Sequence, residues 1–253
     1  MVFYDAHLTY GAAMNLTAPL PKLNVFLSML DDELDRTGVT GGLVYNCAID
    51  YAGVVVGNGA LANDLKTARH ELYGVYTLVP SYTNELPKAE MLYDAMKVQK
   101  MGALRLHPKA HGFIAKAGIL SDYLSMAQEC HIPVILDTAC GLTPEDCWDF
   151  MCAYPDLTSI LSIDATWPTD RMVRPFLAQF KNLYYDLSHM ITEHGLESLV
   201  SFCGAERLLF ASDYPARYIG GQQMMLKYSL LSEEEKDLIA GENLLRLLRE
   251  AKL

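Results

Sequence analysis

Short apolar runs rich in β-branched and aromatic residues alternate along the chain with longer stretches in which apolar residues recur at helical spacing. This alternation is typical of βα units built around a parallel sheet. The strands that we predict are Val2–His7, Gly42–Asn46, Gly74–Pro80, Ala103–His107, Pro133–Asp137, Ser159–Asp164, Leu183–Leu187 and Arg207–Ser212. They follow one another at intervals of roughly 25 to 40 residues, which is the spacing of a (β/α)8 barrel. The pattern therefore predicts one domain, a parallel TIM-like (β/α)8 barrel, over residues 1–253.

Helix signals separate the predicted strands. Thr143 is a typical N-cap, and Pro144–Asp146 place a proline and two acidic residues in the first helical turn. After an acidic helix start at Ser232–Glu235, leucines recur at helical spacing in Leu244–Leu248. We expect this last helix to pack on the outside of the barrel. The segment Tyr51–Asn63 is compatible with either a buried strand extension or a glycine-rich loop.

Composition and charge narrow the class of protein. Hydrophobic residues make up 51% of the 253 residues, enough for a substantial core, and this excludes disorder as the main character of the chain. The formal net charge of -11 opposes binding to nucleic acids and to anionic membrane surfaces. No apolar run approaches the ~18 residues of a membrane span, and Met1–Asp5 lack the regions of a signal peptide. We expect a soluble cytoplasmic protein.

The six cysteines are scattered and form no Cys-x-x-Cys pair, so neither a zinc ribbon nor a thioredoxin-like motif is present. Most of them are expected to be small core residues. Cys140 follows an apolar run and precedes Gly141, so it is the one cysteine to consider as a reactive thiol at a strand end.

Polar side chains gather where the predicted strands end, which in a parallel barrel is the edge that carries function. These residues are Asp5, His7, Arg105, His107, Asp137, Asp164, Asp186, His189 and Asp213. Residues two apart on a strand share a face, so Asp5 should point the same way as His7, and Arg105 the same way as His107. Buried charges need partners. For Asp5 we expect an ion pair within the barrel, whereas His7 and Asp213 are expected to serve function.

Several motifs, in order along nearly the whole chain, resemble the amidohydrolase superfamily, specifically its amidohydrolase-2 branch. The motifs are Tyr4–His7, Gly102–Phe113, Ile132–Leu136, Tyr154–Leu157, Arg207–Pro215 and Gly241–Asn243. The resemblance implies a barrel that binds one divalent metal, usually zinc, and that hydrolyses amide, ester or lactone bonds or decarboxylates aromatic acids. It also implies that the strand-eight carboxylate, Asp213 here, takes the proton from water.

Three departures from the family pattern concern the metal ligands. Thr9 replaces the second histidine of the Asp-x-His-x-His motif, and Asp137 stands where the family usually has a histidine at the end of strand five. Ile163 occupies the position of the strand-six histidine. His7, Asp137 and Asp213 are then the candidate metal ligands, with Asp5 and Asp164 as secondary candidates. Such an oxygen-rich set suits Mn²⁺ or Mg²⁺ better than Zn²⁺. The alternative is loss of the metal, with metal-free acid–base chemistry or binding alone.

Candidate roles follow from these positions. Asp213 is the predicted general base, and His107 is the second catalytic candidate. The predicted substrate-binding residues are Arg105, His111, His189 and Arg217. A guanidinium at the barrel mouth suits bidentate recognition of a carboxylate, but Arg105 could equally form a salt bridge with Asp137 or Asp186.

The sequence therefore predicts a hydrolase or decarboxylase of a small, anionic, carboxylated metabolite, working with a metal or without one. The alternatives are a barrel that only binds such a ligand and a partner-binding scaffold; a homo-oligomer is compatible with any of them. All of these hypotheses require His7 and Asp213 to lie across one cavity.

Overall fold

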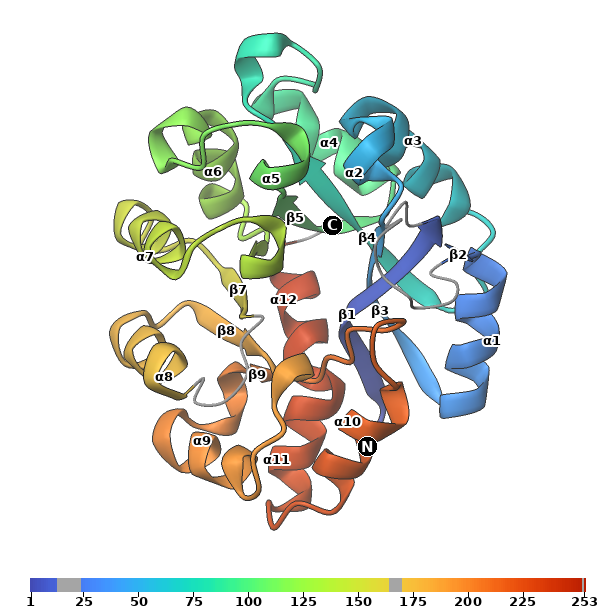
Figure 1. The fold of residues 1–253 in the computed structure, drawn as a ribbon, viewed down its shortest axis with the longest axis vertical. Helices are drawn as coiled ribbons and strands as arrows, with labels where there is room; N and C mark the ends of the chain where they lie inside the picture. The colour runs from blue at the N-terminus through green and yellow to red at the C-terminus, as the bar shows by residue number, and fades with distance from the viewer. Residues whose placement is uncertain (13–23, 164–169, 252) are drawn as a thin grey trace.

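The computed structural model describes residues 1–12, 24–163, 170–251 and 253. Within them, parallel strands follow one another in chain order around a nearly closed ring (Figure 1). They are β1 (Phe3–Ala12), β3 (Val39–Asn46), β4 (Glu71–Leu78), β5 (Met101–Leu106), β6 (Val134–Asp137), β7 (Ser159–Ser162), β8 (Leu183–Asp186) and β9 (Leu208–Leu209). The predicted (β/α)8 barrel is confirmed. The strand interiors are buried on both faces, which explains their continuous apolar runs.

The ring closes between the first and last parallel strands. The Ala6 N–H donates to the carbonyl of Phe210 at 2.9 Å, and the Thr9 N–H donates to that of Tyr214 at 2.8 Å. β1 extends to Ala12, past the end predicted at His7, because its backbone groups beyond His7 still form hydrogen bonds with neighbouring chain segments. β9 is correspondingly shorter than predicted. A short strand, β2 (Asn24–Val25), pairs antiparallel with the end of β1 and was not predicted.

Helices surround the strands (Figure 1). Those of the outer layer are α1 (Leu27–Thr37), α3 (Val54–Asp64), α4 (Ala89–Val98), α6 (Ser121–Glu129), α7 (Pro144–Ala153), α8 (Asp170–Gln179), α9 (Gly195–Cys203) and α10 (Ile219–Lys227). The shorter ones are α2 (Ile49–Ala52), α5 (Pro108–His111) and α11 (Glu233–Asp237). The predicted start of α7 is confirmed, since Thr143 and Asp146 form a capping box. Among the described residues, no helix is long and apolar enough to span a membrane.

The ambiguous segment Tyr51–Asn63 is neither a strand extension nor a glycine-rich loop, but the end of α2 and most of α3. Gly53, at φ +86°, separates the two helices, a backbone conformation that suits glycine. A Cβ at Gly57 would lie 2.6 Å from Cα of Ile49, so the glycine allows close packing of α2 on α3. Asn58 fixes α3 to β4 through two 3.0 Å bonds with the backbone of Thr77.

The last helix, α12 (Asn243–Ala251), forms as predicted, but it lies across the strand starts rather than against the side of the barrel (Figure 1). A Cβ at Gly102, near the start of β5, would lie 2.6 Å from a methyl carbon of Leu248. The Tyr93 hydroxyl donates to the carbonyl of Ala251 at 3.1 Å. The leucines of α12 therefore cover the lower opening, and this leaves the opposite edge for the site.

Glycine also sets the spacing of β1 and β3. A Cβ at Gly42 would lie 2.0 Å from the carbonyl oxygen of Asp5, a distance that no real side chain could occupy. The two strands can therefore approach at this level only because residue 42 carries no side chain.

Candidate functional site

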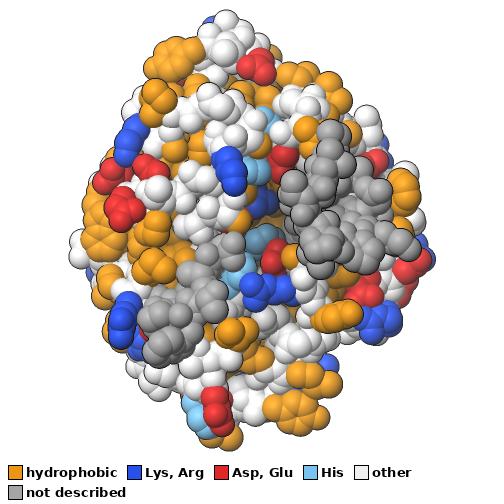
Figure 2. Space-filling view, viewed as in Figure 1, with side chains coloured by type: hydrophobic (Ala, Val, Ile, Leu, Met, Phe, Trp, Pro, Cys, Tyr) orange, Lys and Arg blue, Asp and Glu red, His pale blue; other side chains and the backbone are white. Residues whose placement is uncertain are grey.

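A cavity of about 570 Å³ opens at the carboxyl ends of the strands. Its lining includes His7, Arg105, His107, Asp137, His189, Asp213 and Arg217, all of which the sequence pointed to. Figure 2 shows basic, acidic and histidine side chains gathered in a hollow near the centre of this face. The expectation that His7 and Asp213 share one cavity is met. Of the other candidates, Asp5 and His111 are not among its described lining residues, and Asp164 lies outside the residues that the structure describes.

His7 projects from β1 into an ion pair with the end of β8. Its Nδ1 donates to Asp186 Oδ2 at 2.7 Å, and Asp186 Oδ1 accepts the Ser188 N–H at 2.7 Å. Burial by itself lowers the pKa of His7, but the Asp186 carboxylate outweighs it and raises that pKa to about 9. Burial opposes ionisation of Asp186 as well, yet His7 and Ser188 hold its pKa at about 2. His7 is therefore an imidazolium at neutral pH, with Asp186 as its fixed counter-ion.

Asp213 follows β9 and lies among three nitrogen-bearing side chains. Its carboxylate oxygens lie 3.8 Å from Nε2 of His7, 3.8 Å from Nε2 of His189 and 3.5 Å from Nε of Arg217. The first two distances are too long for direct hydrogen bonds. Burial raises the pKa of Asp213, and the neighbouring charges of His7 and His189 only partly offset this. Its φ of +57° is unusual for a residue other than glycine, and such backbone strain is typical of functional sites.

Arg105 projects from β5 and pairs with Asp137 at the end of β6. Its Nη2 donates to Asp137 Oδ2, while Asp137 Oδ1 accepts the Ala139 N–H at 2.8 Å. The guanidinium carbon lies 4.3 Å from the centre of the Tyr45 ring, a cation–π contact. Burial opposes ionisation of Asp137, but Arg105 and His7 lower its pKa overall. Of the two roles considered for Arg105, the salt bridge to Asp137 is the one observed.

Cys140 also lines the cavity and is buried close to this pair. Its Sγ lies 3.5 Å from Asp137 Oδ2, and burial raises the pKa of the thiol. A thiol that resists ionisation is a poor nucleophile. The structure therefore favours a packing role for Cys140 over the reactive one.

His107 is held by a carboxylate that the sequence did not single out. Its Nδ1 donates to Asp50 Oδ1 at 2.7 Å, and the Tyr45 hydroxyl donates to the same oxygen. Asp50 lies on α2, four residues after the end of β3, so a search of the first turn after each strand would have found it. The His111 ring lies edge-on to that of His107, 6.1 Å between centroids, and burial lowers the pKa of His111. Asp50 and Tyr45 thus belong to the site.

Asp5 does not form the expected ion pair with any of the described residues. Its side chain is fully buried, and Oδ1 accepts backbone N–H groups from His7 at 2.9 Å and from Ser212 at 3.1 Å. Burial raises the pKa of Asp5 to about 7 despite these bonds. Two backbone N–H groups on Oδ1 thus hold this carboxyl group where the sequence predicted a counter-ion, and they join β1 to the chain that follows β9.

The proposed metal ligands do not fit a divalent cation. In the described parts of the chain, no three histidine, cysteine, aspartate or glutamate side chains are arranged to hold one. Asp137 has one oxygen on Arg105 and the other on a backbone N–H. The positive charge next to Asp137 is thus a guanidinium of the protein itself.

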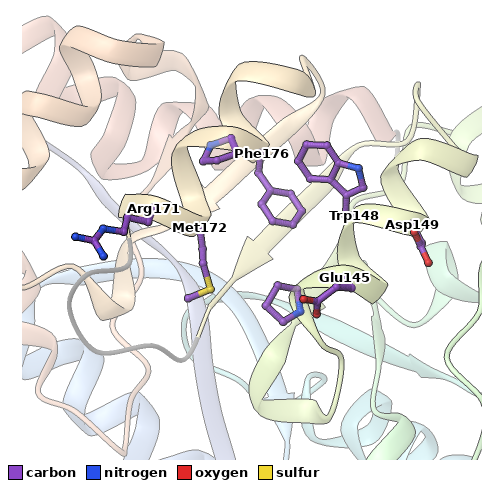
Figure 3. Close-up of a pocket in the computed structure, with 8 residues that line it drawn as sticks. Glu145, Trp148, Asp149, Arg171, Met172 and Phe176 are labelled. Atoms are coloured by element: carbon purple, nitrogen blue, oxygen red, sulfur yellow. The ribbon is translucent and has the colours of Figure 1, made fainter.

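A second hollow, of about 340 Å³, lies between α7 and α8 in the outer layer. Trp148, Met172 and Phe176 face it, with Glu145, Asp149 and Arg171 nearby (Figure 3). Trp148 packs edge-on against Phe176 at 5.1 Å between centroids. Among its described lining residues there is none of the candidate site residues, so we place the chemistry in the cavity at the strand ends.

These features define the class of the molecule: a TIM barrel with a ligand-sized polar cavity at the carboxyl ends of its strands. The model of an amidohydrolase family, Amidohydro_2, matches residues 60–249. The chain belongs to this family, as the sequence motifs predicted.

Solved structures with the same fold are distant in sequence. An uncharacterised TIM-barrel protein of Bordetella bronchiseptica is 18% identical, with a TM-score of 0.74 and 100% of both chains covered. A dihydroxybenzoic acid decarboxylase of Polaromonas, with bound manganese and the inhibitor 2-nitroresorcinol, is 13% identical, with a TM-score of 0.73, covering 98% of this chain and 97% of the other. A probable 2-pyrone-4,6-dicarboxylic acid hydrolase of Acinetobacter baumannii, with bound citric acid, is 16% identical, with a TM-score of 0.68, covering 98% and 100%. No curated protein matches the chain in sequence.

Proposed function

We propose that this protein hydrolyses an ester or lactone bond in a small carboxylated metabolite, without a bound metal and with Asp213 as general base. The observation that carries the proposal is the position of Asp213. Its carboxylate reaches the cavity with a raised pKa, between the imidazoles of His7 and His189. A carboxylate that is harder to ionise is a stronger base once ionised, which suits removal of a proton from water.

The cations around the cavity support a carboxylated substrate. Arg105, Arg217 and the His7 imidazolium all line it, and Arg217 keeps 38% of its side chain exposed. An anionic ligand gains from such a field, and guanidinium groups bind carboxylates well. Arg105 retains N–H groups besides the Nη2 that is directed to Asp137.

The step can be written with the groups present. Asp213 accepts one proton of a water molecule while the water oxygen bonds to the carbonyl carbon of the substrate. The carbonyl π electrons move to its oxygen, and the resulting negative charge is stabilised by the neighbouring imidazolium of His7. When the carbonyl re-forms, the bond from carbon to the leaving oxygen breaks, and that oxygen takes back from Asp213 the proton that came from water. If His107 supplies the proton instead, Asp213 then releases its proton to solvent and His107 takes one up, so that both groups are regenerated. The products are a carboxylic acid and an alcohol.

The ion pair of Arg105 and Asp137 favours hydrolysis over decarboxylation. The Polaromonas decarboxylase is described with bound manganese, whereas here Arg105 lies on the candidate ligand Asp137. The Acinetobacter protein is described as a probable 2-pyrone-4,6-dicarboxylic acid hydrolase. A 2-pyrone is a cyclic ester, and this one carries two carboxylic acid groups. The likeness to either is one of fold, so the arrangement of Arg105 and Asp137 in this chain carries the choice.

The test is whether the protein, after treatment with EDTA, hydrolyses carboxylated γ- and δ-lactones. Hydrolysis is measured by the release of protons. We expect turnover to survive the chelator and Asp213→Asn to lower kcat by about 100-fold or more. Glu234→Gln, which removes an exposed carboxylate on α11, is the matched control and should leave kcat unchanged.

Loss of activity in EDTA that Mn²⁺ or Zn²⁺ restores would contradict the metal-free proposal. Release of CO₂ from aromatic acids would assign the site to decarboxylation instead. Stabilisation by carboxylates with no turnover of any lactone, ester or aromatic acid would identify a binding protein.

A further inference from the structure

A side pocket of about 120 Å³ adjoins the main cavity. The two share four lining residues, which are Thr9, Cys47, Asp213 and Ala216. The remaining described walls of the side pocket are Tyr10, Gly11 and Pro215. Asp213 therefore lies between the main cavity and the much smaller side pocket.

The lining of the side pocket is chemically unlike that of the main cavity. Besides the four shared residues, the main cavity presents guanidinium, imidazole and carboxylate groups together with Tyr45, Ala139 and Cys140, whereas the side pocket adds only Tyr10, Gly11 and Pro215. Burial raises the pKa of the Cys47 thiol to about 11, so it is neutral at pH 7. A small neutral group fits such a lining better than a charged one.

The walls are held in place by hydrogen bonds. The Tyr10 hydroxyl donates to Asp64 Oδ2 at 2.7 Å, and the Cys47 N–H donates to the Tyr10 carbonyl at 2.8 Å. Gly11 has φ +106°, and a Cβ there would lie 2.3 Å from Asn46 Oδ1. The pocket is thus a built feature of β1 and the loops that follow β3 and β9.

We infer that the side pocket is a subsite for a short aliphatic branch of the substrate, close to the reacting carbon. At roughly 30 Å³ for each water-sized group, its volume accommodates about four heavy atoms. The ligand class is then a small hydroxy acid or its lactone that carries a methyl to isopropyl branch beside the carbonyl carbon, which is attacked by the water molecule that Asp213 deprotonates. This inference rests on the proposed carboxylate-binding function of the main cavity.

Binding of three dicarboxylic acids tests the subsite without requiring turnover. The probes are malate, 2-methylmalate and 2-isopropylmalate, and Kd is measured by calorimetry with the whole protein. Each CH₂ that becomes buried tightens binding roughly fourfold. We expect 2-isopropylmalate to bind about tenfold more tightly than malate, or better.

Filling the subsite should abolish this preference. Ala216→Leu changes an exposed position on the pocket wall. It should reduce the ratio of the Kd of malate to that of 2-isopropylmalate to below about threefold, because the isopropyl carbons of the ligand can no longer be buried. Ala110→Leu makes the same change at an exposed position on α5 outside the described lining, and it should keep the full ratio. Cys47→Leu provides a second filling variant.

Equal Kd values for the three acids in the unmodified protein would overturn the inference, as would a preference that survives both filling variants. Failure of all three acids to bind would overturn both the subsite and the carboxylate recognition proposed above. Tighter binding of the branched acid with no lactone turnover would support the subsite while overturning only the hydrolysis.

Discussion

Arg105 on β5 donates through Nη2 to Oδ2 of Asp137 at the end of β6, and both side chains are buried. The same carboxylate was a candidate metal ligand, so the protein supplies positive charge at that place from its own chain. A covalently attached cation cannot dissociate into solution, and its charge does not depend on metal supply. The ion pair should also contribute to the stability of the fold.

Removal of Arg105 alone should strongly destabilise the fold. Arg105→Met leaves Asp137 as an uncompensated buried charge, which should reduce the free energy of unfolding by about 3–5 kcal/mol. Urea unfolding at pH 7 measures this. The double variant Arg105→Met/Asp137→Leu removes both charges and should recover most of the loss. A double variant as unstable as the single one would show that the ion pair is not responsible.

The ion pair of His7 and Asp186 should make stability depend on pH in two windows. Since the pKa of His7 is raised from 6.5 to about 9, its contribution is fully present below pH 6.5 and is lost as pH rises toward 9. Since the pKa of Asp186 is lowered from 3.8 to about 2, its contribution is present above pH 3.8 and is lost as pH falls toward 2. In Asp186→Asn, an NMR titration of the His7 ring should give a pKa near 6.5 or below. A pKa that stays near 9 in this variant would mean that another group holds the proton.

Asp5 should make the protein less stable as pH rises between about 4 and 7. Its pKa is raised to about 7 in the folded protein, so the native state binds more protons than the unfolded chain in this range. Asp5→Asn keeps a carbonyl acceptor for the N–H groups of His7 and Ser212 but cannot ionise, so its unfolding free energy should lack this decline. Asp5→Ala also loses the acceptor and should cost about 2–4 kcal/mol at pH 5, because two buried donors are unpaired. The same decline with pH in Asp5→Asn would assign the effect to another group.

Asp50 should act on the reaction through His107. Asp50→Asn weakens the bond that orients the imidazole, and a misplaced catalytic group typically lowers kcat by about tenfold to 100-fold. The effect should fall on kcat more than on KM and should change the pH profile of kcat, which a purely structural role would not do. Tyr45→Phe removes the other donor to Asp50 Oδ1 and leaves His107 in place, so its kcat should fall much less. Equal losses in both variants would argue against positioning by Asp50.

The barrel could be predicted from the sequence because parallel strands buried on both faces leave continuous apolar runs. Val134–Leu136 and the start of β5 are examples. The far end of β1 could not be predicted, since Thr9 and Tyr10 continue the strand through backbone bonds to Tyr214 and Cys47. Those partners are distant in the chain and have no signal in local composition. The position of α12 below the barrel was missed for the same reason.

For the site, the strand-end rule identified which residues could meet but not which would pair. Asp137 and Asp186 both end strands, and only the three-dimensional arrangement assigns the first to Arg105 and the second to His7. Asp50 was missed because it lies on α2, four residues beyond the end of β3, whereas the strand-end rule covers only the residues at the strand ends. The shared cavity of His7 and Asp213 is now an observation, whereas their chemical roles stay predictions.

Gly42 limits how this protein can be modified. A side chain at residue 42 would push β1 away from β3, and His7 on the same strand would move with it relative to Asp186. Ala216 and Arg217, which line the cavity, remain exposed and partly exposed to solvent. Libraries that aim to alter ligand preference should therefore diversify the loop after β9 and keep the glycine fixed.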